Sequence, residues 1–405
     1  MGKHLRTLPL TLALALGATA TGVLFAPVAV GAAASPPCSP IAGERAGAGV
    51  LHGVPDHRRL RRDAEAVSAL GIPAVQARAT AGPITCSARV GVADVRTGRD
   101  IPADGAFRIA STSKALTATV VLQLVGEGRL GLDDRIERWL PGLVAGRAIT
   151  IRQVLQHTSG LPDAIPSWNT EAEYLKLRYQ RYSTRQLVED AVAMPKLFEP
   201  GEGWAYSNTG YLIAELIIER VTGQPWAAEF ERRIFRPLGM DHTYWPGSSP
   251  DIRLPHALQY QRFHGKLVDV TSQIPAYPAG GIVSTTRDLD VFFRALLGGR
   301  LLRPAELAAM KSTRPVDAAL QKFWPGGEYG LGLVSRPLTD TGDERYWGHD
   351  GGDSGSIVTT GFAEDGRRGA VVSMNFGLDA TFEETLAQQR AADRVVRNVL
   401  RPPRR

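Results

Sequence analysis

The chain has 405 residues, of which 43% are hydrophobic and 22% are charged, a composition that indicates a globular protein and excludes a disordered or fibrous one. Its length predicts one large folding unit or two interleaved units. The formal charge is +6, and much of the excess lies in two arginine-rich runs, 58–62 and 401–405, which contain no aromatic residues. We therefore expect solvated basic ends with weak affinity for anionic surfaces and no nucleic-acid site.

Residues 1–34 are typical of a secretory signal peptide. Lys3 and Arg6 precede an apolar stretch, and the small residues 32–34 supply a cleavage site. The alternative is an uncleaved anchor, because apolar residues continue to Val30. Cleavage would leave 45 basic and 41 acidic residues, a charge of +4. We expect a secreted protein on the cell-wall side, without a stable membrane anchor.

Two cysteines, Cys38 and Cys86, follow this segment. An even number of cysteines in a secreted protein predicts a disulfide, here between the N-terminal tail and an early strand. Two free buried thiols are the alternative. Neither cysteine has histidine or cysteine neighbours at metal-ligand spacing, so we expect no metal site.

The first third of the chain predicts a helix, two strands and a strand-to-helix junction. Residues 35–58 are rich in Gly, Ala and Pro and predict a flexible leader. A helix is expected over 59–70, followed by strands over 75–79 and 86–93. A short apolar segment then enters a helix at Ser111.

The middle of the chain is helical, and the last third returns to strands. Thr150 and Gln153 form a capping-box pattern, starting a helix that ends near His157. A histidine that closes a helix before a glycine favours a structural role over a catalytic one. Further helices are expected at 211–221, 225–235, 287–297 and 383–400, and strands at 329–334, 345–348, 356–360 and 369–374.

Strands at both ends of a helical middle predict an α/β (α+β) fold, in which an antiparallel sheet flanked by helices carries an inserted all-helical domain. The expected divisions are a signal peptide (1–34), a leader (35–58), a sheet domain (59–110 and 276–400), a mainly helical domain (111–275) and a basic tail (401–405).

Three short motifs carry the candidate chemistry. Ser111 and Lys114 form Ser-x-x-Lys at a helix start, where the lysine amine can take the serine proton and free backbone N–H groups favour negative charge. This motif alone is weak, since chance gives about one in a chain of this length. Tyr206 and Asn208 belong to Tyr-Ser-Asn before a helix, and His349 begins His-Asp-Gly-Gly at a strand end.

With these motifs in this order, the chain resembles the serine penicillin-binding-protein and class C β-lactamase superfamily, especially its secreted D-alanyl-D-alanine carboxypeptidases. The likeness spans roughly residues 60–400 and includes secondary features at 157–161, 200–201, 280–284 and 329–333.

The resemblance implies a role for each motif residue. Ser111 would be the acylated nucleophile and Lys114 its activating partner. Tyr206 would shuttle protons, as a phenolate favoured by the lysine ammonium. Asn208 would hold the substrate amide, and His349 would take the place of the lysine in the more usual Lys-Thr-Gly motif.

The resemblance further implies an oxyanion hole made by the backbone N–H groups of Ser111 and Gly352, with Gly351 and Gly352 lining the substrate cleft. It implies no cofactor. Peptidoglycan peptides or other small acyl compounds would be substrates, and β-lactams would be covalent ligands.

The sequence departs from the carboxypeptidase pattern around the expected substrate carboxylate. Asp350 and Gly352 stand where hydroxyl residues are common, and Val334 stands where an arginine is common. An acidic Asp350 beside the pocket would repel a substrate carboxylate, unless the nearby Arg336 compensates.

The function expected first is therefore a serine hydrolase acting as a D-Ala-D-Ala carboxypeptidase. An esterase, a D-amino-acid peptidase or a weak β-lactamase are alternatives of the same fold, and a catalytically silent wall-associated binding protein is the alternative of another class.

Overall fold

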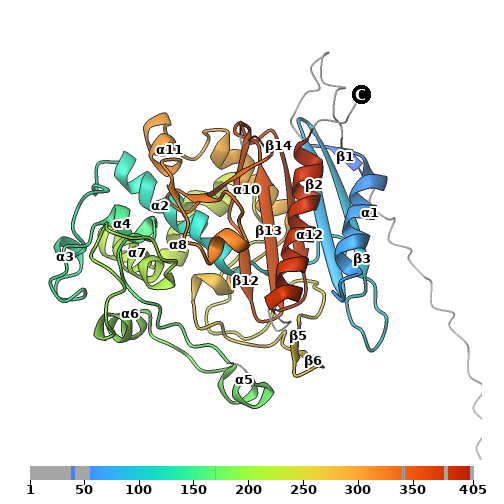
Figure 1. Ribbon diagram of the computed structural model, residues 1–405, viewed down its shortest axis with the longest axis horizontal. Helices are drawn as coiled ribbons and strands as arrows, with labels where there is room; N and C mark the ends of the chain where they lie inside the picture. The colour runs from blue at the N-terminus through green and yellow to red at the C-terminus, as the bar shows by residue number, and fades with distance from the viewer. Residues whose placement is uncertain are drawn as a thin grey trace, which may run out of the picture. The chain divides into compact units, whose positions relative to one another are not determined.

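A mainly antiparallel sheet with helices on both faces forms the framework of the molecule (Figure 1). The computed structural model describes residues 38–41, 55–168, 170–339, 341, 343–377 and 382–401. The predicted signal peptide and most of the predicted leader lie outside these residues. Residues from Pro36 onward form one compact unit, and the domain division expected within it stays a prediction.

The strands of the large sheet follow the order β1-β3-β2-β14-β13-β11-β10-β9-β8, with β12 paired to β13. Their bounds are β1 Cys38–Pro40, β2 Ala74–Ala81, β3 Ile84–Gly91, β8 Arg314–Pro315, β9 Glu328–Tyr329, β10 Val334–Pro337, β11 Arg345–Gly348, β12 Gly351–Asp353, β13 Ser356–Phe362 and β14 Arg368–Met374. Two smaller pairs are β4 Phe107–Arg108 with β7 Val283–Ser284, and β5 Tyr260–Phe263 with β6 Lys266–Asp269.

The helices are α1 His57–Ser68, α2 Ser113–Gly126, α3 Ile136–Trp139, α4 Ile151–Leu155, α5 Glu171–Leu177, α6 Thr184–Ala193, α7 Asn208–Thr222, α8 Trp226–Phe230, α9 Arg236–Leu238, α10 Thr286–Leu297, α11 Pro304–Met310 and α12 Phe382–Leu400. Short 3₁₀ turns lie at Ala110–Thr112, Ala279–Gly281 and Leu320–Lys322, and a π-helical turn, Glu231–Phe235, continues α8.

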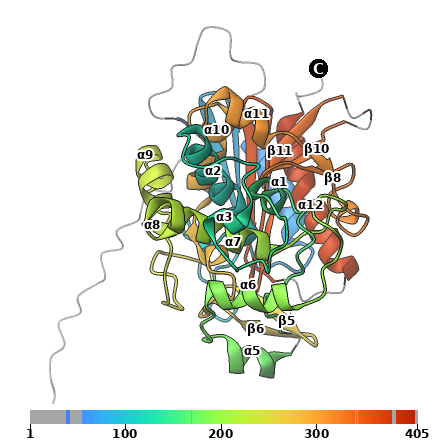
Figure 2. The same ribbon diagram turned by 90° about the vertical axis from the view of Figure 1, so that its left-hand side faces the viewer.

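Helices α1 and α12 pack side by side on one face of the sheet, and α10 covers β2 and β14 on the other face (Figures 1 and 2). Central strand β2 is consequently buried along almost its whole length. A second, larger core is formed by α2, α4, α7, α8 and α10. This arrangement confirms the predicted fold class, an antiparallel sheet flanked by helices with a helical segment between its halves.

Cys38 and Cys86 form the expected disulfide, at paired positions of β1 and β3. The disulfide thus attaches the N-terminal segment around Cys38 to the edge of the sheet. Within the described residues, no helix combines the length and the apolar composition that crossing a bilayer would require.

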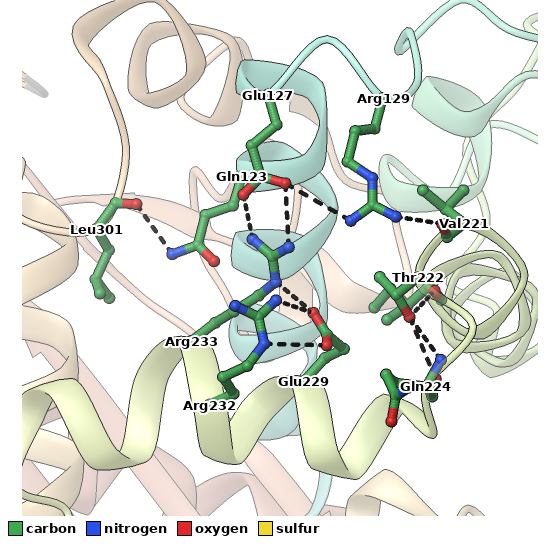
Figure 3. Close-up of polar contacts among 11 residues, drawn as sticks. Gln123, Glu127, Arg129, Val221, Thr222, Gln224, Glu229, Arg232, Arg233 and Leu301 are labelled. Atoms are coloured by element: carbon green, nitrogen blue, oxygen red, sulfur yellow. Dashed lines mark hydrogen bonds and ion pairs between the residues drawn. The ribbon is translucent and has the colours of Figure 1, made fainter.

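Helix α2 begins two residues after the candidate nucleophile Ser111, and ion pairs hold its far end (Figure 3). Arg233, on the π-helical turn after α8, contacts both Glu127, which follows α2, and Glu229 on α8. The Arg129 guanidinium donates to the carbonyl of Val221 near the end of α7. Three helices are therefore held together at the end of α2 opposite the candidate site.

Candidate active site

The nucleophile lies at a tightly held junction between β4 and α2. Arg108 on β4 is 1% exposed, and its guanidinium donates to the Gln259 side-chain oxygen and the Thr271 carbonyl, each at 2.7 Å. Ala110 then adopts φ +47°, a conformation that non-glycine residues rarely take and that is common beside active sites. The following 3₁₀ turn places Ser111 at the entry to α2.

Ser111, Lys114 and Asn208 are brought together as the motifs predicted. Lys114 Nζ lies 2.9 Å from Ser111 Oγ and donates to Asn208 Oδ1 at 2.6 Å. Asn208 starts α7, and its Nδ2 donates to Asp163 Oδ2 at 2.7 Å. Helices α2 and α7, far apart in the sequence, therefore position one lysine against one serine.

Burial makes Lys114 a usable base. Its side chain is completely buried, and this burial lowers its pKa from 10.5 to about 7, although Asp163 and Glu215 oppose the shift. Near neutral pH a large fraction of Lys114 is therefore uncharged and can accept the proton of Ser111.

Tyr206 is held close to Ser111 as a neutral phenol. Burial raises its pKa above the ordinary value, and a hydrogen bond with the Ser111 hydroxyl opposes this shift only in part. The Lys114 Nζ lies 5.0 Å from the centre of the Tyr206 ring. The phenolate that the resemblance implied is thus disfavoured in the resting site, because no full positive charge offsets the burial of the oxygen.

His157 holds the loop that carries Tyr206. It has φ +61°; its carbonyl accepts from Ala205 N at 3.0 Å and its Nδ1 accepts from Ser207 N at 3.1 Å. Its ring packs 4.3 Å from that of Tyr206, centre to centre. Burial lowers the pKa of His157 well below its usual value, so the imidazole is a neutral support, in agreement with the structural role favoured by the sequence.

Gly351 allows strand β12 to approach the nucleophile. A Cβ at this position would lie 2.2 Å from the carbonyl oxygen of Ile109 and 2.9 Å from Thr112 Oγ1. Only glycine fits such a close approach. As a result Gly352 lines the same cavity as Ser111, as an oxyanion hole built from their N–H groups requires; that role stays a prediction.

His349 lies behind the reacting groups. Its Nδ1 lies 2.6 Å from the Asp350 carbonyl, which can only accept, so this nitrogen carries the proton and Nε2 accepts from the Tyr329 hydroxyl at 2.9 Å. Burial, followed by the charge of Lys114, lowers its pKa to about 3. Its ring centre is 6.5 Å from that of Tyr206. Because the imidazole is neutral at pH 7 and bonds to Tyr329, we interpret His349 as a support for the site.

The expectation that Asp350 faces the substrate is wrong. Its carboxylate accepts from both terminal nitrogens of Arg336, at 2.8 and 3.2 Å, from the Trp324 indole at 3.0 Å and from Thr360 N at 3.2 Å. Arg336 is 2% exposed, so it needs an anionic partner. The compensation by Arg336 does occur, but within the protein interior and away from the cavity.

The cavity beside Ser111 has a volume of about 410 Å³. Its described lining is Ala110, Ser111, Asp163, Ile165, Pro166, Ser167, Trp168, Asn208, Gln261, Ala276, Tyr277, Gly280, Gly352, Asp353 and Ser354. The lining includes two carboxylates, of Asp163 and Asp353, and no lysine, arginine or histidine. Trp168 borders the cavity and donates to Ser354 Oγ at 3.0 Å.

Sequence reasoning missed most of this lining. Asp353 lies only four residues after His349, and Asp163 follows the 157–161 segment, so both were within reach of the motifs. Trp168 and Gln261 carry no local signal, because they reach the cavity from a long loop and from the β5–β6 pair. A larger hollow of about 800 Å³, near Arg345 and Glu364, contains none of the predicted catalytic residues.

A model of the family described as "Beta-lactamase" matches residues 58–393. The chain belongs to the beta-lactamase family. It is 29% identical to penicillin-binding protein 4* of Bacillus subtilis over 76% of this chain and 69% of that protein, and 32% identical to esterase EstB of Burkholderia gladioli over 66% and 76%. A D-stereospecific amidohydrolase from Streptomyces sp. has a similar structure, with a TM-score of 0.73 and 34% identity over 82% of this chain and 97% of that one.

This beta-lactamase family member is therefore a serine hydrolase of the fold shared with penicillin-binding proteins, as the sequence resemblance predicted. Its relatives differ in their named activities, so the family alone does not choose a substrate. Among the described residues, no cluster of His, Cys, Asp and Glu side chains could hold a metal ion.

Proposed function

We propose that this protein is a secreted serine amidohydrolase that acylates Ser111 with neutral amides or esters of D-amino acids and short peptides. The observation that carries the proposal is the charge of the cavity, in which two carboxylates accompany the nucleophile and the described lining contains no basic side chain. A substrate carboxylate would be repelled there, whereas a free ammonium group would be attracted. The D-stereospecific amidohydrolase from Streptomyces sp. supports the assignment to D-amino-acid derivatives.

The chain's residues would carry the acylation as follows. Neutral Lys114 takes the proton of Ser111 while Oγ attacks the substrate carbonyl, and the N–H groups of Ser111 and Gly352 bind the resulting oxyanion. Tyr206 donates its proton to the leaving nitrogen or oxygen and is reprotonated from Lys114, so no net charge stays in the site. Water then cleaves the acyl-enzyme through the same groups in reverse.

A D-Ala-D-Ala carboxypeptidase, which the sequence favoured, fits the cavity less well because its substrate ends in a carboxylate. An esterase is the second candidate, supported by the 32% identity with esterase EstB and by the same absence of basic side chains from the described cavity lining. A catalytically silent binding protein would have no use for a buried lysine 2.9 Å from a serine hydroxyl.

The test compares kcat/KM for D-phenylalanine amide, its N-acetylated form, D-phenylalanine methyl ester and the free-acid dipeptide D-Ala-D-Ala. We expect the amide and ester with a free amine to exceed the N-acetyl amide by about tenfold, the effect of one partly screened charge contact. The free acid should be the poorest substrate. A higher kcat/KM for the free acid would contradict the proposal and restore the carboxypeptidase assignment.

Two variants sharpen this test. Ser111→Ala should remove all turnover and all covalent labelling while the protein stays folded. Asp353→Asn should lower the preference for the free amine over the N-acetyl amide about tenfold and change neutral substrates little. An unchanged preference would show that Asp353 does not contribute to recognition.

Location and ligands complete the proposal. We infer secretion from the signal-like residues 1–34, and this can be tested by N-terminal sequencing of protein recovered from the culture medium. Labelling of Ser111 by fluorescent penicillin would establish β-lactams as covalent ligands; the penicillin-binding relative supports this expectation. Peptidoglycan peptides with amidated ends are further candidate substrates.

A further inference from the structure

A buried carboxyl group lies close to the catalytic lysine and has no part in the reaction described above. Glu215, on α7, is 0% exposed, as is Lys114. Neither of its carboxylate oxygens has a well-aligned hydrogen-bond partner within the described residues, and the same holds for the hydroxyls of Tyr277 and Ser113. Four buried polar atoms in one region are thus left without good partners. Such atoms lower stability, and a functional role can explain why a protein retains them.

Tyr277 connects this carboxyl group with the lysine. Its hydroxyl interacts with both Ser113 and Glu215, in contacts too loose to count as well-formed hydrogen bonds. On the other side, Lys114 Nζ lies 4.5 Å from the centre of the Tyr277 ring. Glu215 and Lys114, both fully buried, therefore face the same aromatic side chain.

An ionised carboxylate in such a region would be unfavourable. Burial raises the pKa of Glu215 to about 8, while Tyr277 and Lys114 lower it and Glu219 raises it further. Asp163 is the other carboxylate that acts on Lys114. Burial keeps the nearby histidines, His157 and His349, neutral. Glu215 raises the pKa of Lys114 and Lys114 lowers that of Glu215, as expected of two interacting titratable groups.

We propose that Glu215 is a positioning residue that sets the protonation equilibrium of Lys114 across Tyr277. With its carboxyl group protonated, Glu215 carries no charge and Lys114 is free to act as a neutral base toward Ser111. A carboxylate in the same place would hold a proton on the lysine and remove the base. The inference rests on the proposed function only in taking acylation of Ser111 as the reaction.

The first experiment measures the pH dependence of Ser111 acylation by p-nitrophenyl acetate in the wild type and in Glu215→Gln. Glutamine keeps the size and polarity of the side chain but cannot ionise. The midpoint of the acid limb should therefore fall by about 0.5 to 1 pH unit, less than the 1–3 units that a fully ionised neighbour produces. Glu219→Gln, one turn along the same helix, is a control of opposite sign: Glu219 raises the pKa of Glu215, so removing its charge should not lower the midpoint.

An unchanged midpoint in Glu215→Gln would overturn the proposal, even if the rate fell, because a purely structural role lowers the rate without moving a pKa. Equal downward shifts of the acid-limb midpoint in Glu215→Gln and Glu219→Gln would also overturn the proposal, because the loss of any negative charge on α7 would then explain the result.

A second measurement does not require Glu215 to be replaced. Infrared difference spectra of protein with ¹³C-labelled glutamate should show a protonated carboxyl band that titrates near pH 8, the raised pKa of Glu215. Lys114→Met should move this titration to higher pH, because the lysine charge favours the carboxylate. An equal midpoint with and without the lysine would show that the groups are uncoupled. By contrast, wild-type protein that p-nitrophenyl acetate does not acylate would refute the proposed function and leave the infrared result to decide on the coupling.

Discussion

Replacing Lys114 by methionine should abolish acylation and at the same time stabilise the protein near neutral pH. The wild-type side chain is completely buried, and its pKa falls from 10.5 when solvated to about 7 in the folded protein. Folding at pH 7 must therefore remove the proton from about half of the Lys114 side chains. Methionine has a similar length and carries no such cost.

The magnitude follows from proton linkage. A difference of 3.5 pKa units, 10.5 minus 7, corresponds to a cost of about 4 kcal/mol at pH 7, after allowing for half protonation of the folded state. The variant loses the contacts of Nζ with Ser111 and Asn208, and an unpartnered Asn208 oxygen costs about 1–3 kcal/mol. The net gain in the free energy of unfolding should be about 1–3 kcal/mol.

The stability advantage of Lys114→Met over the wild type should decrease as the pH rises. Between about pH 7 and 10.5 the unfolded wild type binds the lysine proton and the folded form does not, so wild-type stability rises with pH. The advantage of Lys114→Met should shrink by about 2 kcal/mol between pH 7 and pH 9. Urea unfolding at both pH values, with the disulfide intact, measures this difference. Groups that do not interact with Lys114 contribute equally in the two proteins, whereas Glu215, whose pKa the lysine lowers, should add to the decrease.

A stability difference that stays constant over this pH range would refute the reasoning, because it would mean that Lys114 is charged in the folded protein. Acylation could not then begin with proton transfer from Ser111 to a neutral lysine, and Tyr206 would have to act as the base instead.

Two further predictions concern buried ion pairs. Asp350→Asn leaves Arg336 with only the carboxylate of Asp393, 3.4 Å away, and should lower the free energy of unfolding by about 1–3 kcal/mol. The ratio of kcat/KM for free-acid to methyl-ester substrates should stay unchanged, and a shift in that ratio would return Asp350 to the substrate pocket. Arg233→Met should cost about 1–3 kcal/mol in urea unfolding at pH 7, because Glu229, whose side chain is 3% exposed, keeps only Arg232. The arginine partners of Glu229 lower its pKa by more than burial raises it. The stability difference between wild type and Arg233→Met should therefore become smaller in acid, where the carboxylate is protonated. An equal stability difference at pH 7 and in acid would contradict the assignment.

Local sequence patterns predicted the elements whose ends carry strong signals. The capping box at Thr150 and Gln153 starts α4 in the structure, and strand β11 has the bounds that its pattern predicted. The expected single strand over 329–334 is wrong: β9 ends at Tyr329 and β10 begins at Val334. A turn separates them at Gly332, whose φ of +79° and close approach to α2 no alternating pattern reveals.

The sequence predicted the part of the site that lies at the start of a helix, the pair Ser111 and Lys114. A separation of three residues, across the 3₁₀ turn and the start of α2, brings Lys114 to Ser111, as helical spacing predicts. The shift in the pKa of Lys114 was not predictable, because it results from burial between α2 and α7. The sequence in turn led to a phenolate for Tyr206, which the same burial disfavours.

The charge of the cavity depends on side-chain directions that no local motif contains. Asp350 and Asp353 lie three residues apart. Asp350 forms a buried ion pair with Arg336 on β10, whereas Asp353 lines the cavity. Arg108 lies near Asp353, but its terminal nitrogens already donate to oxygens from residues 250, 259, 271 and 273 at 2.6–3.1 Å. Both terminal nitrogens are therefore engaged, and Nε has no partner among the described residues. Arg108 acts on Asp353 only through its charge, so the carboxylate can still contact a ligand in the cavity. The charge selectivity that we propose would thus depend on two arginines, because Arg336 forms an ion pair with Asp350 and Arg108 forms no hydrogen bond with Asp353 among the described contacts.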